Sequence, residues 1–143
     1  MHSIYLCLSY IFHAFAEIFL KIRVYKKKED PNRYKEKLGI YKLKNKDNVL
    51  WFHSSSLGEI KSILPLIFHY NKKNKKILIT TVTKSSAEYC KSIFKKNSNI
   101  IHQYAPLDTP IIVKKFLNHW KPYLAIFVES ELWPNLLFQS AKN

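Results

Sequence analysis

The chain has 143 residues, of which 47% are hydrophobic and 15% aromatic, enough to bury the core of one ordinary domain. Its 24 lysines and arginines outnumber its 10 acidic residues. The resulting net charge of +14 favours an anionic partner, namely a nucleic acid, an anionic lipid or a phosphorylated substrate. Cys7 and Cys90 have neither metal-binding nor redox spacing, which is typical of free thiols in a reducing compartment.

The first segment, residues 4–20, is mostly apolar and aromatic, and a group of cations follows it at once. These cations are Lys21, Arg23 and the run at 26–28. A signal peptide carries its positive charge before the apolar run, whereas cations just after such a run mark the cytoplasmic side of a membrane. The pattern therefore predicts an uncleaved membrane anchor and basic flank over residues 1–28. His13 and Glu17 interrupt the run, so a helix lying in the membrane interface fits it nearly as well as a spanning helix.

Residues 29–48 are polar and are predicted to form a juxtamembrane linker. A short helix is expected at 34–38, ended by Gly39. The cations of this segment are either solvated or form a collar for anionic lipid or lipid phosphate. They include Arg33, Lys35, Lys37 and Lys42.

From Val49 onward, apolar runs typical of strands alternate with helical patterns. Strands are expected at 49–53, 77–82, 99–103 and 123–128, and helices at 58–70, 84–96, 111–120 and from 132 onward. Continuous apolar strands separated by helices predict an α/β fold, in which a Rossmann-like parallel sheet has flanking helices and right-handed crossovers. The pattern stops soon after its fourth strand, so we expect a fragment or one half of a two-domain protein.

Three polar turns follow strands in this scheme. They lie at residues 53–59, 80–86 and 129–131. Because the carboxyl ends of parallel strands meet at one edge of a sheet, Glu59 is expected to share a cleft there with Glu129 or Glu131. A carboxylate within hydrogen-bond reach of a hydroxyl can act as a general base. The alternative is helix capping, since Ser56 and Glu59 have the spacing of a capping box and the other two glutamates precede a helix.

Several other residues of these turns bear on which reactions and ligands the chain could support. Gly58 is expected where a tight turn or a close ligand approach forbids a Cβ. The threonines and serines at 80–86 either bind phosphate or sugar hydroxyls or serve as strand-end and cap residues. His53 beside three serines lacks the G-x-S-x-G pattern, which disfavours nucleophilic hydrolysis. No dinucleotide, phosphate-loop or metal-spaced motif is found, so no cofactor and no metal are expected.

Three segments together resemble one known family. They are HSSSLGE at 53–59, HQYAPLDTP at 102–110 and VESELWPN at 128–135. In this order, behind an apolar N-terminal segment, they are similar to the 3-deoxy-D-manno-octulosonic acid (Kdo) transferases, which build the inner core of lipopolysaccharide. The resemblance covers essentially the whole chain. It implies a GT-B glycosyltransferase on the cytoplasmic side of the cell inner membrane, with an active site between two Rossmann-like domains. Residues 49–143 would be the acceptor domain for a lipid A precursor, and the C-terminal domain that takes CMP-Kdo would be absent or separate.

The resemblance also implies roles for individual residues. Glu59, the glutamate of S-x-G-E, would be the general base, and Glu129, the first glutamate of E-x-E-L-W-P, would assist the transition state. Four more residues are expected to bind substrate, namely Ser55, Ser56, Gly58 and Glu131, the last with a structural role as its alternative. The family's T-T-x-T-P-T-G segment is altered here at Lys84 and Ser86, so no contact is carried over to it.

Two functions of different classes follow. The first is the acceptor-side part of a membrane-associated Kdo transferase, whose partners are a lipid A precursor and an anionic membrane surface. The second is a fragment or binding module without catalysis, which holds lipid A or pairs with a separate donor-binding half. A nucleic-acid binder rests on charge alone, and because the aromatic residues follow the period of a core, no nucleic acid is expected as a partner.

Overall fold

The computed structural model describes residues 2–128 and 133–142. The chain divides into two compact units. Unit 1 consists of Met1–Lys44, Pro106–His119 and Leu132–Asn143, and unit 2 of Asn45–Ala105 and Trp120–Glu131. Each unit is therefore built from segments that are separated in sequence. The division into an anchor at 1–28, a linker at 29–48 and an acceptor domain at 49–143 concerns function and stays a prediction.

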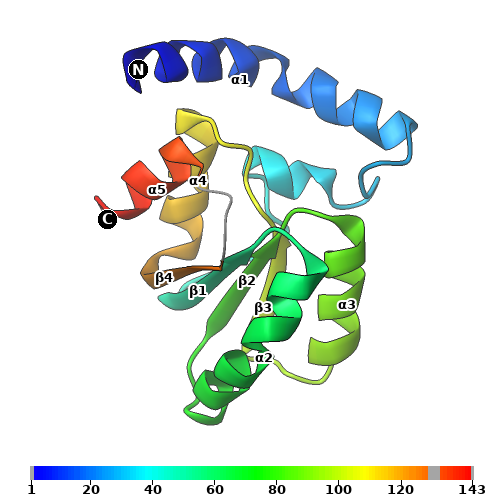
Figure 1. The fold of residues 1–143 in the computed structure, drawn as a ribbon, viewed down its shortest axis with the longest axis vertical. Coiled ribbons are helices and arrows are strands. Elements are labelled where there is room, and N and C mark those ends of the chain that lie inside the picture. Colours follow the sequence, from blue (N-terminus) through cyan, green and yellow to red (C-terminus); the bar gives the residue numbers. More distant parts are fainter. Residues whose placement is uncertain (1, 129–132, 143) are drawn as a thin grey trace. The chain divides into compact units, whose positions relative to one another are not determined.

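Unit 2 contains a four-stranded parallel sheet in the order β3-β2-β1-β4 (Figure 1). Its strands are β1 (Val49–Ser54), β2 (Ile77–Thr81), β3 (Ile100–Tyr104) and β4 (Pro122–Val128). β1 lies in the interior of the sheet, where Leu50 pairs with Ile77 on one side and with Leu124 on the other. The predicted α/β fold with a parallel sheet is confirmed.

Two helices cover one face of this sheet, α2 (Leu57–Lys72) and α3 (Lys84–Phe94). Side chains alternate between the faces of a strand, so every second residue of β1 and β2 points toward these helices. The buried cluster formed there includes Leu50, Phe52, Ile77 and Ile79 from the strands, and Ile60, Ile67, Cys90 and Phe94 from the helices.

The other face of the sheet carries a buried polar and aromatic group. The Trp51 indole N–H donates to Thr80 Oγ1 at 2.8 Å, and His53 Nδ1 lies 2.9 Å from the same hydroxyl. The ring of Phe127 packs edge-on against both Trp51 and His53. His53 is only 2% exposed, so it belongs to the core, in agreement with the low expectation for nucleophilic hydrolysis.

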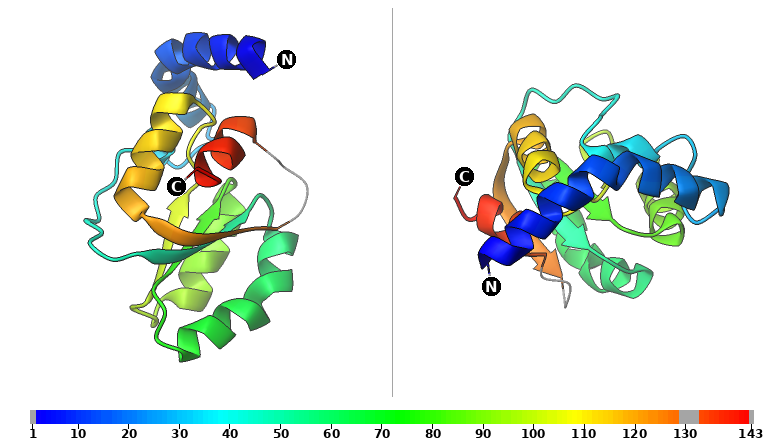
Figure 2. Two further views of the ribbon diagram at one scale, coloured as in Figure 1. Left: turned by 90° about the vertical axis from the view of Figure 1, so that its left-hand side faces the viewer. Right: turned by 90° about the horizontal axis from the view of Figure 1, so that it is seen from above.

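Unit 1 contains α1 (His2–Tyr25), the 3₁₀ helix η1 (Tyr34–Leu38), α5 (Pro134–Ser140) and most of α4 (Pro110–Trp120). Gly39 ends η1 in the left-handed region at φ 75°, as predicted, and a Cβ there would lie 3.1 Å from Lys115 Cβ of α4. α4 and α5 lie beside each other (Figure 2), and Gln139 Nε2 donates to the carbonyl of Pro110 at 3.1 Å.

A buried ionic cluster joins the end of α1 to η1. Glu29 is 3% exposed, and its carboxylate pairs with Arg23 Nε at 2.8 Å and with Lys37 Nζ at 2.7 Å. Burial lowers the pKa of Lys37 although the Glu29 carboxylate opposes that shift. The expectation that Lys37 belongs to a cationic collar is therefore wrong, because this ammonium is buried and paired, whereas Lys35 and Lys42 are exposed.

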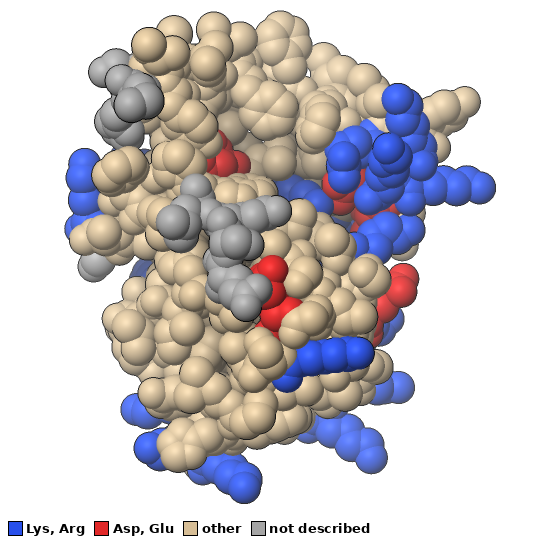
Figure 3. Space-filling model, in the orientation of Figure 1, with Lys and Arg blue, Asp and Glu red and all other residues tan. Residues whose placement is uncertain are grey.

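The polarity of α1 is reversed relative to a helix of a soluble domain. One stripe of the helix faces the rest of unit 1 and consists of Tyr5, Ser9, His13, Ala16 and Leu20, of which the first three are polar. The opposite stripe is apolar and 50–67% exposed, and consists of Ile4, Leu8, Ile11, Phe15, Ile18 and Ile22. The surface that α1 forms in Figure 3 is accordingly free of Lys and Arg until its C-terminal end. By length and composition alone, the segment Ile4–Tyr25 is able to cross a membrane, so the predicted apolar N-terminal helix is confirmed.

Candidate functional site

The carboxyl edge of the sheet brings together the strands that precede the predicted polar turns. His53 of β1 pairs with Thr80 of β2, and Ser54 pairs with Val128 of β4. The described ends of these three strands therefore lie at neighbouring positions on one edge of the sheet. Glu129 and Glu131 lie outside the described residues, so their meeting with Glu59 stays a prediction.

The carboxylate of Glu59 is held at the start of α2 by the two serines before it. Ser56 is the N-cap residue, and its Oγ accepts from the Glu59 backbone N–H at 3.3 Å. The same hydroxyl donates to Glu59 Oε1 at 3.0 Å, while the Ser55 backbone N–H donates to Oε2 at 2.7 Å. Half of the predicted capping box is present, since Ser56 Oγ accepts from the Glu59 N–H, but the carboxylate accepts from the N–H of Ser55 rather than from that of the N-cap residue Ser56. Together these hydrogen bonds fix the orientation of the carboxylate.

Capping leaves Glu59 able to accept a further proton. A carboxylate has about four lone-pair positions, two on each oxygen. The two hydrogen bonds from Ser55 and Ser56 occupy one position on each oxygen, and the Glu59 side chain is only half-buried. An oriented, accessible carboxylate at the carboxyl edge of a parallel sheet has the geometry that a general base requires.

Gly58 does not lie in a tight turn, contrary to that expectation. α2 begins at Leu57, one residue earlier than predicted, so Gly58 is the second residue of a helix rather than part of the loop. A Cβ built on it would have as its nearest neighbour only Ser56 Oγ, at 3.9 Å. The surface over Gly58 is therefore open, which is the condition for the close ligand approach that was the other expectation.

The turn at 80–86 is structural. Thr80 and Thr81 are fully buried, and Thr81 Oγ1 lies 2.9 Å from His102 Nε2 on β3. Thr83 caps α3, since its Oγ1 accepts from the Ser86 N–H at 3.3 Å. The interpretation of these residues as strand-end and cap residues is confirmed.

Asp108 is a residue whose role sequence reasoning missed. Within unit 1, its Oδ1 accepts from the Leu136 N–H at 2.8 Å, and its Oδ2 accepts from the Asn135 N–H at 3.1 Å and from the Tyr5 hydroxyl. The Asn135 side chain donates back to the Asp108 carbonyl at 2.8 Å. We call this arrangement the Asp108 cap. It joins the A-P-L-D segment to the E-L-W-P-N segment and fixes the residues that follow 129–132.

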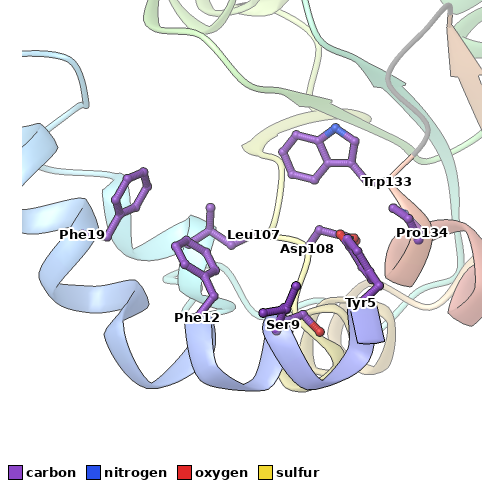
Figure 4. A pocket seen from close by; sticks show the side chains of 9 residues that line it. Tyr5, Ser9, Phe12, Phe19, Leu107, Asp108, Trp133 and Pro134 are labelled. Atoms are coloured by element: carbon purple, nitrogen blue, oxygen red, sulfur yellow. The ribbon is translucent and has the colours of Figure 1, made fainter. Parts of the chain in front are cut away.

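A cavity of about 520 Å³ lies beside the Asp108 cap, also within unit 1 (Figure 4). α1 supplies Tyr5, Leu8, Ser9, Phe12 and Phe19 to its lining, and the rest comes from Leu107, Asp108, Trp133 and Pro134. The lining is mostly apolar and aromatic. Trp133, at the N-cap position of α5, contributes its side chain to this lining.

In the part of the chain that the structure describes, no group of three or more His, Cys, Asp or Glu residues is placed to hold a metal ion.

Comparison with known proteins gives a consistent result. Residues 32–143 match the family model described as 3-deoxy-D-manno-octulosonic-acid transferase. The chain is 35% identical to a probable mitochondrial 3-deoxy-D-manno-octulosonic acid transferase of Arabidopsis thaliana, over 99% of this chain and 32% of that protein. It is 37% identical to the 3-deoxy-D-manno-octulosonic acid transferase of Rickettsia bellii, over 99% of this chain and 34% of that protein. The chain thus spans about a third of the length of these curated relatives.

Proposed function

The chain belongs to the 3-deoxy-D-manno-octulosonic acid (Kdo) transferase family, and from this premise we propose that it supplies the acceptor side of Kdo transfer in lipopolysaccharide biosynthesis. The donor would be CMP-Kdo and the acceptor a lipid A precursor. The observation that carries the proposal is the oriented carboxylate of Glu59, held by Ser55 and Ser56 at the carboxyl edge of the sheet.

In the proposed reaction, Glu59 takes the proton of an acceptor hydroxyl as its oxygen attacks the anomeric carbon of Kdo. The new carbon–oxygen bond forms while the bond to the phosphate of CMP breaks, and CMP leaves with the electron pair. Ser55, Ser56 and Gly58 would contact the acceptor around this carboxylate. Glu129 would support the positive charge that develops on the sugar, and Glu131 would bind substrate beside it.

The donor site belongs, in this proposal, to the portion of the family protein that the chain does not cover. The relatives are about three times as long as the matched region. A GT-B enzyme places its active site between two Rossmann-like domains, so residues 49–143 would form the acceptor domain and require a donor-binding half for activity.

Membrane attachment is proposed from the reversed polarity of α1. Its apolar stripe is exposed, while its polar stripe makes hydrogen bonds within unit 1, from Tyr5 to Asp108 and between His13 and Thr109. A spanning helix would exchange these contacts for lipid and carry Glu17 into the hydrocarbon. We therefore favour a helix lying in the interface, on the cytoplasmic side of the inner membrane, with the cations at 26–28 at the headgroups.

The second candidate function, a binding module without catalysis, is favoured by one observation. Glu59 already serves as the second partner of a capping box, which is a complete structural reason for a glutamate at this position. In that case the chain would hold lipid A, or pair with a donor-binding half, without moving a proton.

The substitution Glu59→Gln separates the two candidates. It is measured in the chain supplied with a donor-binding half, by following Kdo transfer and the melting temperature together. Glutamine also serves at this capping position, but it accepts no proton, so a general base predicts a loss of about 10²–10⁴-fold in turnover with an unchanged melting temperature.

The matched control is Glu88→Gln, on the exposed surface of α3, which should change neither quantity. If Glu59→Gln retained its turnover, Glu59 would be a helix cap and not the general base. Transfer by the 143-residue chain alone would contradict the proposed need for a donor-binding half.

A further inference from the structure

The cavity beneath α1 is mostly apolar, and two of the polar groups in its lining already make hydrogen bonds. Ser9 Oγ, a polar atom of the lining, already donates to the Leu6 carbonyl at 2.8 Å. The Asp108 carboxylate already accepts from two backbone N–H groups and the Tyr5 hydroxyl. A mostly apolar cavity of this kind favours an apolar ligand.

The cavity is continuous with the exposed apolar stripe of α1. Leu8 belongs to both, and it is 60% exposed, while the lining residues Phe12 and Phe19 are 37% and 39% exposed. Figure 4 shows Phe12 and Phe19 of α1 on one side of the cavity and Trp133 on the other. An apolar chain that reaches the stripe from a membrane can therefore enter the cavity without crossing a polar rim.

The charge at the C-terminal end of α1 indicates which kind of lipid would supply the apolar chain. Lysines at 26–28 follow the helix and are exposed, so they are available to phosphate groups of a lipid. The combination of an apolar cavity and exposed lysines after α1 therefore favours a lipid with an anionic head group.

We propose that this cavity binds one acyl chain of the phosphorylated, acylated acceptor lipid. The inference rests on the proposed function for the identity of that lipid. The volume of about 520 Å³ lies within the range of roughly 300–1,000 Å³ typical of ligand pockets. The bound acyl chain would anchor the acceptor lipid on unit 1.

The test uses the fluorescence of Trp133 in the full chain. Bromine atoms quench tryptophan on contact, so vesicles of phosphatidylglycerol with brominated acyl chains serve as the probe, and Trp133→Phe gives the signal of the remaining tryptophans. We expect the Trp133 emission to be quenched, and a lipid A precursor without bromine to relieve the quenching by displacing the brominated chain. Quenching that the precursor does not relieve would assign the cavity to bulk phospholipid and overturn the proposal.

Two substitutions fill the cavity from different walls, Leu107→Phe and Ser9→Phe. Each should reduce the quenching and weaken binding of the lipid A precursor roughly tenfold, the equivalent of about two methylene groups left unburied. Leu66→Phe, the same replacement at an exposed position of α2, is the matched control and should change nothing. Unchanged quenching in both folded cavity variants would overturn the proposal. Because quenching needs no turnover, a failure of Kdo transfer would count against the proposed function and leave the cavity assignment standing.

Discussion

At the scale of single residues, Glu59 shows what spacing predicts and what it leaves open. The interval from Ser56 to Glu59 predicted a capping box. The bond from the Glu59 N–H to Ser56 Oγ is confirmed, whereas the carboxylate accepts from the N–H of Ser55, one residue before the N-cap. The same interval says nothing about proton transfer, because a capped carboxylate retains acceptor positions. The role of Glu59 as a base stays a prediction that the glutamine variant tests.

Gly58 offers an independent test of acceptor binding beside Glu59. Gly58 is helical and exposed, and a Cβ at this position would have almost no neighbours. Gly58→Ala should therefore raise the free energy of unfolding by about 0.5–1 kcal/mol. If the acceptor approaches the backbone here, the same methyl group should lower the affinity for the lipid A precursor. Chemical denaturation and equilibrium binding measure the two effects. A more stable variant with unchanged acceptor binding would show that the acceptor does not approach Gly58.

Asp108 is the residue on which the start of α5 depends. Asp108→Ala removes the acceptor for two backbone N–H groups, and loss of such a cap typically costs about 0.5–2 kcal/mol of stability. Amide hydrogen exchange should then accelerate at Asn135 and Leu136 more than elsewhere in the chain. Asp47→Ala is the control, since it removes an exposed partner of Lys76 and should leave the melting temperature unchanged. Equal exchange at those two amides in both variants would contradict the Asp108 cap.

At the scale of elements, strands and helices could be predicted closely because their apolar periods are local. β1, predicted at 49–53, is observed at Val49–Ser54, and α4, predicted at 111–120, is observed at Pro110–Trp120. The Asp108 cap could not be predicted, because an aspartate just before α4 has the signature of a cap for that helix, whereas it caps α5. Its partners are 27 and 28 residues away, a separation that no local pattern encodes.

The orientation of α1 was also beyond sequence reasoning. In the sequence, His13 appears as a break in an apolar run and Tyr5 as a part of that run, yet both hydrogen-bond within unit 1. Likewise, a polar segment at 29–48 has the composition of a linker, although Glu29 and Lys37 in it are buried as an ion pair. The partners of Tyr5 and His13 lie far along the chain. Lys37 lies on a 3₁₀ helix, whose period differs from that of an α-helix.

The apolar stripe of α1 leads to a prediction about membrane binding. Changing Ile11, Phe15 and Ile18 together to glutamine should weaken binding to phosphatidylglycerol vesicles by about a hundredfold or more, since each fully buried side chain of this size contributes roughly 1.5–3 kcal/mol. The melting temperature in detergent-free buffer should not fall, because these side chains are exposed in the fold. The control changes three exposed apolar residues elsewhere, Leu66, Ile93 and Phe138, to glutamine. Sedimentation with vesicles that is equal for both triple variants would show that the stripe is not the membrane-binding surface.

At the scale of the whole molecule, two features bear on function. Unit 2 presents the Glu59 carboxylate at the carboxyl edge of its sheet, and unit 1 presents an apolar helix and the cavity beneath it. In the proposed function, the Glu59 carboxylate would act on an acceptor hydroxyl. In the further proposal, the cavity would hold an acyl chain of an acceptor lipid.

The most direct test of this account is the equilibrium binding of both substrates by the 143-residue chain, measured separately for CMP-Kdo and for a lipid A precursor in the same buffer and detergent. The account predicts saturable binding of the lipid A precursor and no binding of CMP-Kdo, because the donor site is proposed to lie in the portion of the family protein that the chain does not cover. Binding of CMP-Kdo without binding of the lipid A precursor would contradict the assignment of this chain to the acceptor side.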